Sequence, residues 1–149
     1  MNMRDLSGSK RGFTILEVVI VVVLIGVLAA IALPEYANFL ERGKVTEAVN
    51  AIGSIKSAEL IYKMRNDVYV SITQNTQSRL SEYLKLDIPS TGNWYYHSST
   101  TTTPGGFTVS AFRLPSGGTL NGTYIRLTFD PATGSYAWSG NHPLRPRSE

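Results

Sequence analysis

The sequence contains no cysteine among its 149 residues, and this absence excludes two kinds of structure. A disulfide framework cannot form, and neither can a metal site that uses thiolate ligands. The sequence alone leaves open how the C-terminal end of the chain is held in place without a covalent link.

Histidine is almost as scarce, since only His97 and His142 are present. The chain has no phosphate-binding glycine loop, no HExxH motif and no GxSxG motif. Each histidine is therefore expected to be a surface or strand residue and not a ligand. We expect no catalytic residue, no metal site and no cofactor, and we expect that the protein is not an enzyme.

A strong charge of one sign is also missing. The formal net charge is +3, but Arg4, Asp5, Lys10 and Arg11 all fall within the first 12 residues. The rest of the chain carries 11 basic and 10 acidic side chains, a balance that gives no basic footprint for nucleic acid. The length that remains after the apolar segment described next is enough for one modest globular domain.

One long apolar run is present at residues 13–33, and only Thr14, Glu17 and Gly26 interrupt it. As a helix with a rise of about 1.5 Å per residue, this run reaches roughly 30 Å, the thickness of the hydrocarbon core of a bilayer. It is therefore predicted to span a membrane. Its one charged residue, Glu17, lies one turn into the run, where an ionised group costs on the order of 2.5 to 3.5 kcal/mol. The acid is expected to have a specific use.

The residues in front of this run suggest that use. Lys10, Arg11 and Gly12 precede Phe13, and the string RGFTILE resembles the processing site of type IV pilins and related pseudopilins. The resemblance continues at the spacings of that family's long first helix, in Pro34, Tyr36, Arg42, Val45 and Ala48. The lack of cysteine departs from many type IVa pilins, which close their C-terminal region with a disulfide.

The resemblance implies that a membrane peptidase cuts between Gly12 and Phe13 and that Phe13 is then N-methylated. It also implies that the carboxylate of Glu17 pairs with the terminal amine of Phe13 in a neighbouring subunit during assembly. Residues 1–12 would be a leader, residues 13–33 a transmembrane and polymerisation helix, and residues 34–149 a periplasmic or extracellular head.

The function implied is that of a structural subunit of a type IV pilus, with adhesion, motility or DNA uptake as its uses. The partners implied are other copies in a helical filament, the prepilin peptidase and methyltransferase, the inner-membrane assembly platform, and lipid before assembly. The positively charged residues 1–12 predict a single span with the N-terminus in the cytoplasm and the head outside. After assembly the subunit would lie in an extracellular pilus.

Three alternatives remain. In the first, the chain is the major pseudopilin of a type II secretion system, which has the same N-terminal processing site and apolar helix. Residues 30–32 (Ala-Ile-Ala) resemble an ordinary signal-peptidase site, which would give a mature end at Leu33. A monomeric membrane-anchored binding module would keep the span without being processed.

Gly26 and Pro34 are the weak points of the predicted helix, because glycine is a poor helix former and proline removes a backbone hydrogen bond. Membrane helices tolerate both residues as a simple kink. The resemblance offers a second interpretation, in which the segment between them loses helicity when the subunit leaves the bilayer and packs in a filament.

After Pro34 the pattern becomes amphipathic and predicts helix to about Met64 or Arg65. An apolar stripe at helical spacing should face a sheet; its members are Val45, Ala48, Val49, Ile52, Ile55 and Tyr62. Lys56 and Glu59 intrude at the edges of this stripe, and their long side chains are expected to reach past it to water.

The remainder of the head is predicted to be rich in strands. A short helix containing Leu80, Tyr83 and Leu84, capped by Thr76 or Ser78, precedes four strands at residues 94–97, 107–113, 123–129 and 135–138. Residues 98–103 are predicted to form a loop, and residues 141–149 an extended or frayed tail. The fold class is therefore α+β, with the long N-terminal helix packed on a four-stranded antiparallel β-meander over residues 94–138.

Overall fold

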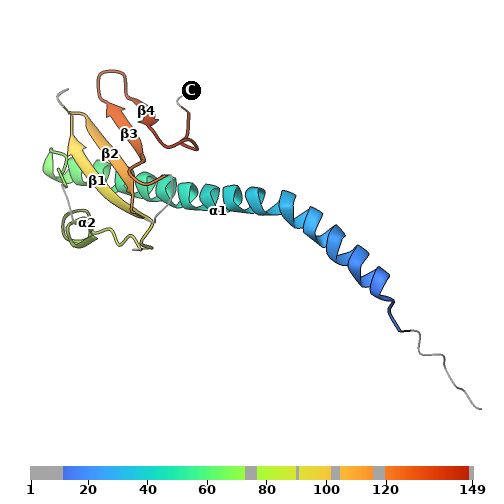
Figure 1. Ribbon diagram of the computed structural model, residues 1–149. Coiled ribbons are helices and arrows are strands. Elements are labelled where there is room, and N and C mark those ends of the chain that lie inside the picture. The colour runs from blue at the N-terminus through green and yellow to red at the C-terminus, as the bar shows by residue number, and fades with distance from the viewer. Residues whose placement is uncertain (1–11, 73–76, 90, 102–104, 116–119, 148–149) are drawn as a thin grey trace, which may run out of the picture. The chain divides into compact units, whose positions relative to one another are not determined.

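The computed structural model describes residues 12–72, 77–89, 91–101, 105–115 and 120–147. The elements follow the order α1 (Ile15–Asn66), α2 (Gln77–Leu84), β1 (Trp94–Thr100), β2 (Phe107–Arg113), β3 (Tyr124–Asp130) and β4 (Ser135–Gly140) (Figure 1). The chain divides into two compact units, one up to Leu40 and one from Glu41 onward, with the boundary inside α1. The α+β class predicted from the sequence is confirmed.

The first unit consists of the apolar part of α1, and its side chains are exposed. Large hydrophobic residues from Phe13 to Leu40 are 45 to 86% exposed. Within the described residues, α1 is the one helix long and apolar enough to cross a membrane. Helical structure continues through both Gly26 and Pro34.

The predicted C-terminal end of α1 is correct to within two residues. The helix ends at Asn66, and Asp67 adopts a positive φ of 59°. The amide of Asp67 donates to the carbonyl of Lys63 at 2.8 Å, and the side-chain amide of Asn66 donates to the carbonyl of Tyr62 at 3.1 Å. A left-handed residue just beyond the helix, together with bonds to the last carbonyls, is a common way for a helix to stop.

In the second unit the predicted apolar stripe of α1 is confirmed. Val45, Ala48, Ile52 and Ile55 are buried, with Ile52 and Ile55 completely inaccessible. They form one core with the inward-facing residues of the sheet, namely Trp94, Tyr96, Phe107, Val109, Ala111, Ile125 and Leu127. One helix face packed on one sheet face therefore makes the hydrophobic core of the head.

One prediction about this stripe is wrong. Glu59 does not reach past the stripe to water but is completely buried. Its Oε2 accepts the amide N–H of Val70 at 3.0 Å, and its Oε1 accepts the hydroxyl of Ser98 at 2.5 Å. Burial raises the pKa of Glu59, against the opposing effect of these two hydrogen bonds. A buried acid is tolerated here because both of its oxygens are hydrogen-bonded.

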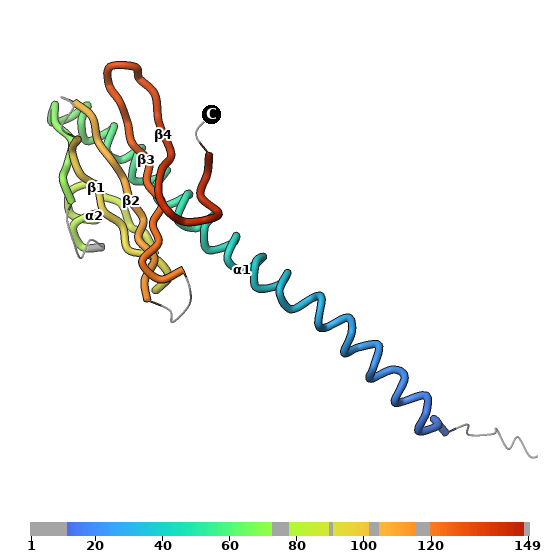
Figure 2. The backbone as a smooth tube through the Cα atoms, turned by 45° about the horizontal axis from the view of Figure 1, so that its top comes forward, coloured from blue at the N-terminus to red at the C-terminus, as the bar shows by residue number. Residues whose placement is uncertain are grey.

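The four strands form an antiparallel sheet in the order β1-β2-β3-β4, so each strand pairs with its neighbours in sequence. Figure 2 shows the successive hairpins of this meander. The predicted segments match the strands, but β1 continues through Thr100 where a loop was predicted from Ser98. The reason is pairing: Ser98, Ser99 and Thr100 lie opposite the first residues of β2, beginning at Phe107. The strand neighbour overrides the weak local preference of a Ser/Thr run.

The short helix is α2, in which Leu80 and Leu84 are buried. Ser78 lies inside the helix, so it is not the capping residue, and Thr76 lies outside the described residues. Lys85 follows the helix with a positive φ of 53° and marks its end.

Candidate functional site

The sequence-predicted processing residues stand at the start of α1. Gly12 and Phe13 precede the helix, and Thr14 occupies the position before its first residue, Ile15. The hydroxyl oxygen of Thr14 accepts the backbone N–H of Glu17 at 3.2 Å. Thr14 therefore caps the helix, because it satisfies one of the amide groups that have no partner within it.

The sequence interpretation missed this cap, although a signal for it was present. Thr14 and Glu17 stand three apart at the start of an apolar run, which is the spacing of a capping box. Glu17 is also the acid in the first helical turn, where the partial positive charge of the helix terminus favours a carboxylate. Part of the use of Glu17 is therefore local to its own chain.

The structure does not place Phe13 against a partner group. Phe13 is 82% exposed, and Glu17 is exposed as well. A Cβ built on Gly12 meets no atom within 4 Å. The fold of this chain thus sets no size limit at residue 12, so a requirement for a small side chain there must come from another molecule.

The two predicted weak points lie farther along the same helix. Gly26 is surrounded by open space, since a Cβ added to it also meets nothing within 4 Å. Pro34 is inside the helix, eight residues later. Loss of helicity between Gly26 and Pro34 stays a prediction.

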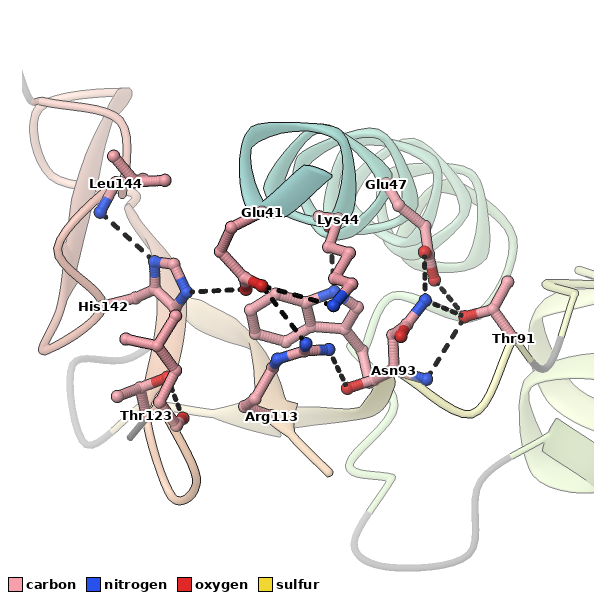
Figure 3. Close-up of polar contacts among 11 residues, drawn as sticks. Glu41, Lys44, Glu47, Thr91, Asn93, Arg113, Thr123, His142 and Leu144 are labelled. Atoms are coloured by element: carbon pink, nitrogen blue, oxygen red, sulfur yellow. Dashed lines mark hydrogen bonds and ion pairs between the residues drawn. The ribbon is translucent and has the colours of Figure 1, made fainter. Parts of the chain in front are cut away.

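A buried polar cluster, which we call the Glu41 cluster, lies at the start of the second unit (Figure 3). Glu41 of α1 lies 3.4 Å through Oε2 from Nη2 of Arg113 at the end of β2, and 3.5 Å through Oε1 from Nε2 of His142. Lys44 lies 3.4 Å from the same Oε2. Arg113 is 4% exposed and His142 is completely buried. One carboxylate therefore lies beside Lys44 of its own helix and beside Arg113 and His142 from distant parts of the chain.

Trp94 completes the Glu41 cluster. Its indole N–H donates to the carbonyl of Lys44 at 2.9 Å, and the guanidinium of Arg113 lies 5.3 Å from the centre of its ring. Nη1 of Arg113 donates to the carbonyl of Asn93 at 3.0 Å. The ring of His142 lies 5.6 Å from the indole. These contacts tie the start of β1 to the first turns of α1 in the head.

The contacts of His142 favour a neutral imidazole with its proton on Nε2. Its Nδ1 accepts the backbone N–H of Leu144 at 3.2 Å, so this nitrogen carries a lone pair and Nε2–H faces Glu41. Burial lowers the pKa of His142; the carboxylate of Glu41 opposes this effect, and the charge of Arg113 adds to it. A second proton on Nδ1 would point at the backbone N–H of Leu144. This arrangement also disfavours the charged form of His142.

The Glu41 cluster shows how the end of the chain is held, a point that the sequence left open. The backbone N–H of His142 donates to the carbonyl of Tyr124 at 3.2 Å, and the side-chain oxygen of Asn141 accepts the N–H of Tyr124 at 2.8 Å. Gly140 has a φ of 127°, and a Cβ there would lie 2.2 Å from the Tyr124 carbonyl oxygen, so the close approach requires glycine. The prediction of a frayed tail is wrong for residues 141–144, as is that of a surface or strand position for His142.

Sequence reasoning missed the Glu41 cluster because no local pattern marks it. Glu41 and Arg113 are 72 residues apart, and His142 stands in a Pro-rich tail that resembles a frayed end. Only the rarity of buried histidine and arginine, once burial is known, identifies these residues as structural.

Comparison with known proteins gives two findings. Residues 8–33 match the family model described as the prokaryotic N-terminal methylation motif. A fimbrial protein of Pseudomonas aeruginosa is 46% identical over 50 residues, which cover 34% of this chain and 32% of that protein. The type IV major fimbrial protein FimA of Dichelobacter nodosus is 43% identical over 49 residues, covering 33% of this chain and 31% of that protein.

The type II secretion system core protein G of Pseudomonas aeruginosa is 34% identical over 85 residues, covering 57% of this chain and 58% of that protein. The matched part spans about a third of the length of the fimbrial relatives and somewhat more than half of protein G. The motif and the fimbrial relatives support the resemblance that the N-terminal residues carry.

Proposed function

We propose that this chain, a type IV pilin by its methylation motif and fimbrial relatives, is the structural subunit of a type IV pilus. The observation that carries the proposal is the exposure of the apolar side chains of residues 13–33, for which the described residues provide no cover. Such a surface must be covered by lipid or by other protein. A precursor in a membrane and a subunit in a filament meet this requirement in turn.

In this proposal the precursor spans the inner membrane once, with its N-terminus in the cytoplasm and its head outside. A prepilin peptidase cuts between Gly12 and Phe13, and Phe13 is N-methylated. The inner-membrane assembly platform then adds the subunit to a homopolymer, which becomes an extracellular pilus. The open space around Gly12 supports the idea that the peptidase, and not the fold, selects a small residue there.

Glu17 is proposed to pair with the terminal amine of Phe13 in a neighbouring subunit. Its exposure in the isolated chain leaves it accessible to that partner. A carboxylate in an apolar surrounding is stabilised by a close ammonium, and the pair also fixes the axial offset of the two helices. Loss of helicity between Gly26 and Pro34 would then adapt the helix to the filament.

The second candidate is the major pseudopilin of a type II secretion system. A specific observation favours it: the match to core protein G extends over 85 residues and 57% of this chain, whereas the fimbrial match covers 50 residues and 34% of it. Both candidates share the processing step and the assembly helix. They differ in where the fibre is found.

Two measurements test the proposal. Mass spectrometry of the mature protein should find N-methylated Phe13 as its first residue, and an end at Leu33 would contradict the pilin interpretation. Electron microscopy with an antibody to the head should then show surface fibres containing this subunit. Fibres confined to the periplasm, together with a secretion defect in cells lacking the gene, would favour the pseudopilin instead.

A further inference from the structure

A hollow of about 300 Å³ opens on the head between α1, the segment after α2, and β1. We call it the acidic hollow, because Glu47 and Asp87 line it together with the amide of Asn50. No lysine or arginine stands among the described residues that line it. Its apolar walls are formed by Ala51, Leu86, Ile88 and Pro89. Negative charge between apolar walls suits an organic cation.

The hydroxyl of Tyr96 is a second and independent sign of a ligand. Tyr96 lines the hollow and is only 5% exposed, and its hydroxyl has no hydrogen-bond partner in the described part of the chain. Burial and the neighbouring Glu47 carboxylate raise the pKa of Tyr96, so the hydroxyl keeps its proton. A buried hydroxyl normally has a partner, and its oxygen is free to accept a hydrogen bond from an incoming group.

The carboxylates of the hollow differ in how they are held. Glu47 is fixed, because its Oε2 accepts the side-chain amide of Asn93 at 3.0 Å and its Oε1 accepts the hydroxyl of Thr91. Asp87 is exposed and forms no ion pair among the residues that the structure describes. A planar guanidinium with several N–H donors can bind two carboxylates and a hydroxyl at once.

The chain itself carries such a group without a partner. Arg145 and Arg147 in the C-terminal tail are exposed, and their side chains form no ion pair within the described ranges. The tail leaves from His142, and Figure 3 shows His142 and Glu47 on opposite sides of Glu41. The tail therefore starts on the side of the cluster away from the hollow of its own copy.

We propose that the arginine-bearing tail of one copy, residues 145–147, binds in the acidic hollow of a neighbouring copy. This inference rests on the proposed function, because it requires copies to assemble. A guanidinium would enter between the apolar walls, pair with Glu47 and Asp87, and give the hydroxyl of Tyr96 its missing partner. The contact joins heads, and is distinct from the helix contacts that involve Phe13 and Glu17.

Cysteine cross-linking tests the contact directly, because the natural chain has no cysteine. Full-length chains carrying Asp87→Cys are expressed together with chains carrying Arg147→Cys, and sheared filaments are oxidised. We expect a covalent dimer. The matched control pairs Arg147→Cys with Glu82→Cys, an exposed acid of α2 that does not line the hollow, and this pair should give no dimer.

Charge reversal gives a second readout. Asp87→Lys alone, and the Arg145→Glu and Arg147→Glu pair alone, should each reduce the yield of filaments and their resistance to salt. Combining the reversals should restore both properties, since the charges are complementary again. Glu82→Lys and Arg79→Glu on α2 serve as controls that should leave both unchanged.

The outcomes separate this inference from the proposed function. If the unaltered chain forms no fibres, the proposed function fails. If fibres form but the Asp87 and Arg147 pair gives no more dimer than the control, the tail inference is overturned while the pilus remains. A chain carrying both Asp87→Cys and Arg147→Cys is also mixed with an excess of unaltered chain before oxidation. A link that still forms, within single chains, would overturn the inference as well.

Discussion

Glu17 is the residue whose chemistry has to serve two purposes. Within its own chain it lies in the first turn of α1, three residues after the cap Thr14. Between chains it is proposed to bind the terminal amine of Phe13. Both roles use the negative charge, but the interaction with the helix terminus is worth only about 0.3 to 1 kcal/mol at an exposed site. Loss of the first role would weaken the start of α1, whereas loss of the second would stop assembly, so the two roles are separated by what is measured.

We predict that Glu17→Gln and Glu17→Ala both leave cleavage and membrane insertion largely intact but sharply reduce fibre assembly. Both changes remove the charge, and neither makes the span less suited to the membrane than the ionised acid does. The measurement compares mature subunit in the membrane with subunit in sheared fibres. Glu35→Gln, at the other exposed acid among the described residues of the first unit, is the control and should assemble normally. Normal fibre yield from Glu17→Gln would refute the pairing mechanism.

A second prediction at the residue scale concerns Gly12. Gly12→Val should cause uncut precursor to accumulate, and Gly12→Ala should do so less, because in the proposed function the peptidase requires a small side chain there, whereas a Cβ at residue 12 meets no atom within 4 Å. Immunoblotting of precursor and mature forms gives the ratio. Gly43→Val is the matched control, since a Cβ at Gly43 also meets nothing within 4 Å, and it should be processed normally. Full processing of Gly12→Val would show that residue 12 is only a linker.

At the scale of elements, the head part of α1 is held by its apolar stripe. Ile52 is completely buried in the core that this stripe forms with the sheet. We predict that Ile52→Ala lowers the free energy of unfolding of the head by about 2 to 5 kcal/mol, through lost burial and the cavity left behind. Asn50→Ala, at an exposed position of the same helix, should change it by less than about 0.5 kcal/mol. Denaturant unfolding followed by circular dichroism measures both variants.

The C-terminal tail is the element whose attachment depends on pH. Burial lowers the pKa of His142 below its ordinary value of 6.5, so the unfolded chain binds a proton more readily than the folded chain. The contribution of His142 to stability is therefore fully present above pH 6.5 and is lost as the pH falls toward the lower pKa of the folded state. We predict that unfolding free energy measured against pH declines less on acidification in His142→Gln than in the unaltered head.

His97 provides the comparison for this measurement. Its pKa is also lowered, first by burial and then by the charge of Arg126, so it contributes with the same sign. His97→Gln should remove only the contribution of His97 to the pH dependence of unfolding free energy and leave the contribution of His142 unchanged. Equal slopes for His142→Gln and the unaltered head would contradict the neutral, buried state assigned to His142.

At the scale of the whole molecule, the two units differ in whether their apolar side chains are buried or exposed. The buried core lies entirely within the unit from Glu41 onward, whereas the unit up to Leu40 exposes its apolar side chains. We predict that a fragment of residues 41–149 is soluble, monomeric and unfolds in one cooperative transition. Ultracentrifugation and thermal unfolding test this. A fragment that stops at Gly140 is the control and should melt at a lower temperature, because Glu41 then loses His142.

Local patterns in the sequence carried enough information for much of this fold. The apolar run of residues 13–33, the stripe that includes Ile52 and the alternating strands all depend on spacing along the chain, and that spacing follows directly from helix and strand geometry. The predicted processing residues Gly12 and Phe13 are likewise contiguous with the run, so a short string was sufficient to suggest them.

Tertiary structure decided the features that depend on distant neighbours. The sequence predicted Glu59 at the edge of the apolar stripe. In the structure it is buried, because the backbone N–H of Val70 and the hydroxyl of Ser98 donate hydrogen bonds to its oxygens. The sequence predicted an extended or frayed tail at His142, but in the fold its backbone N–H donates to the carbonyl of Tyr124, its Nδ1 accepts the N–H of Leu144, and Glu41 lies 3.5 Å from its Nε2. Burial of a polar side chain is favourable only when its hydrogen-bonding partners are in place, and those partners are brought together by the fold and not by the order of residues.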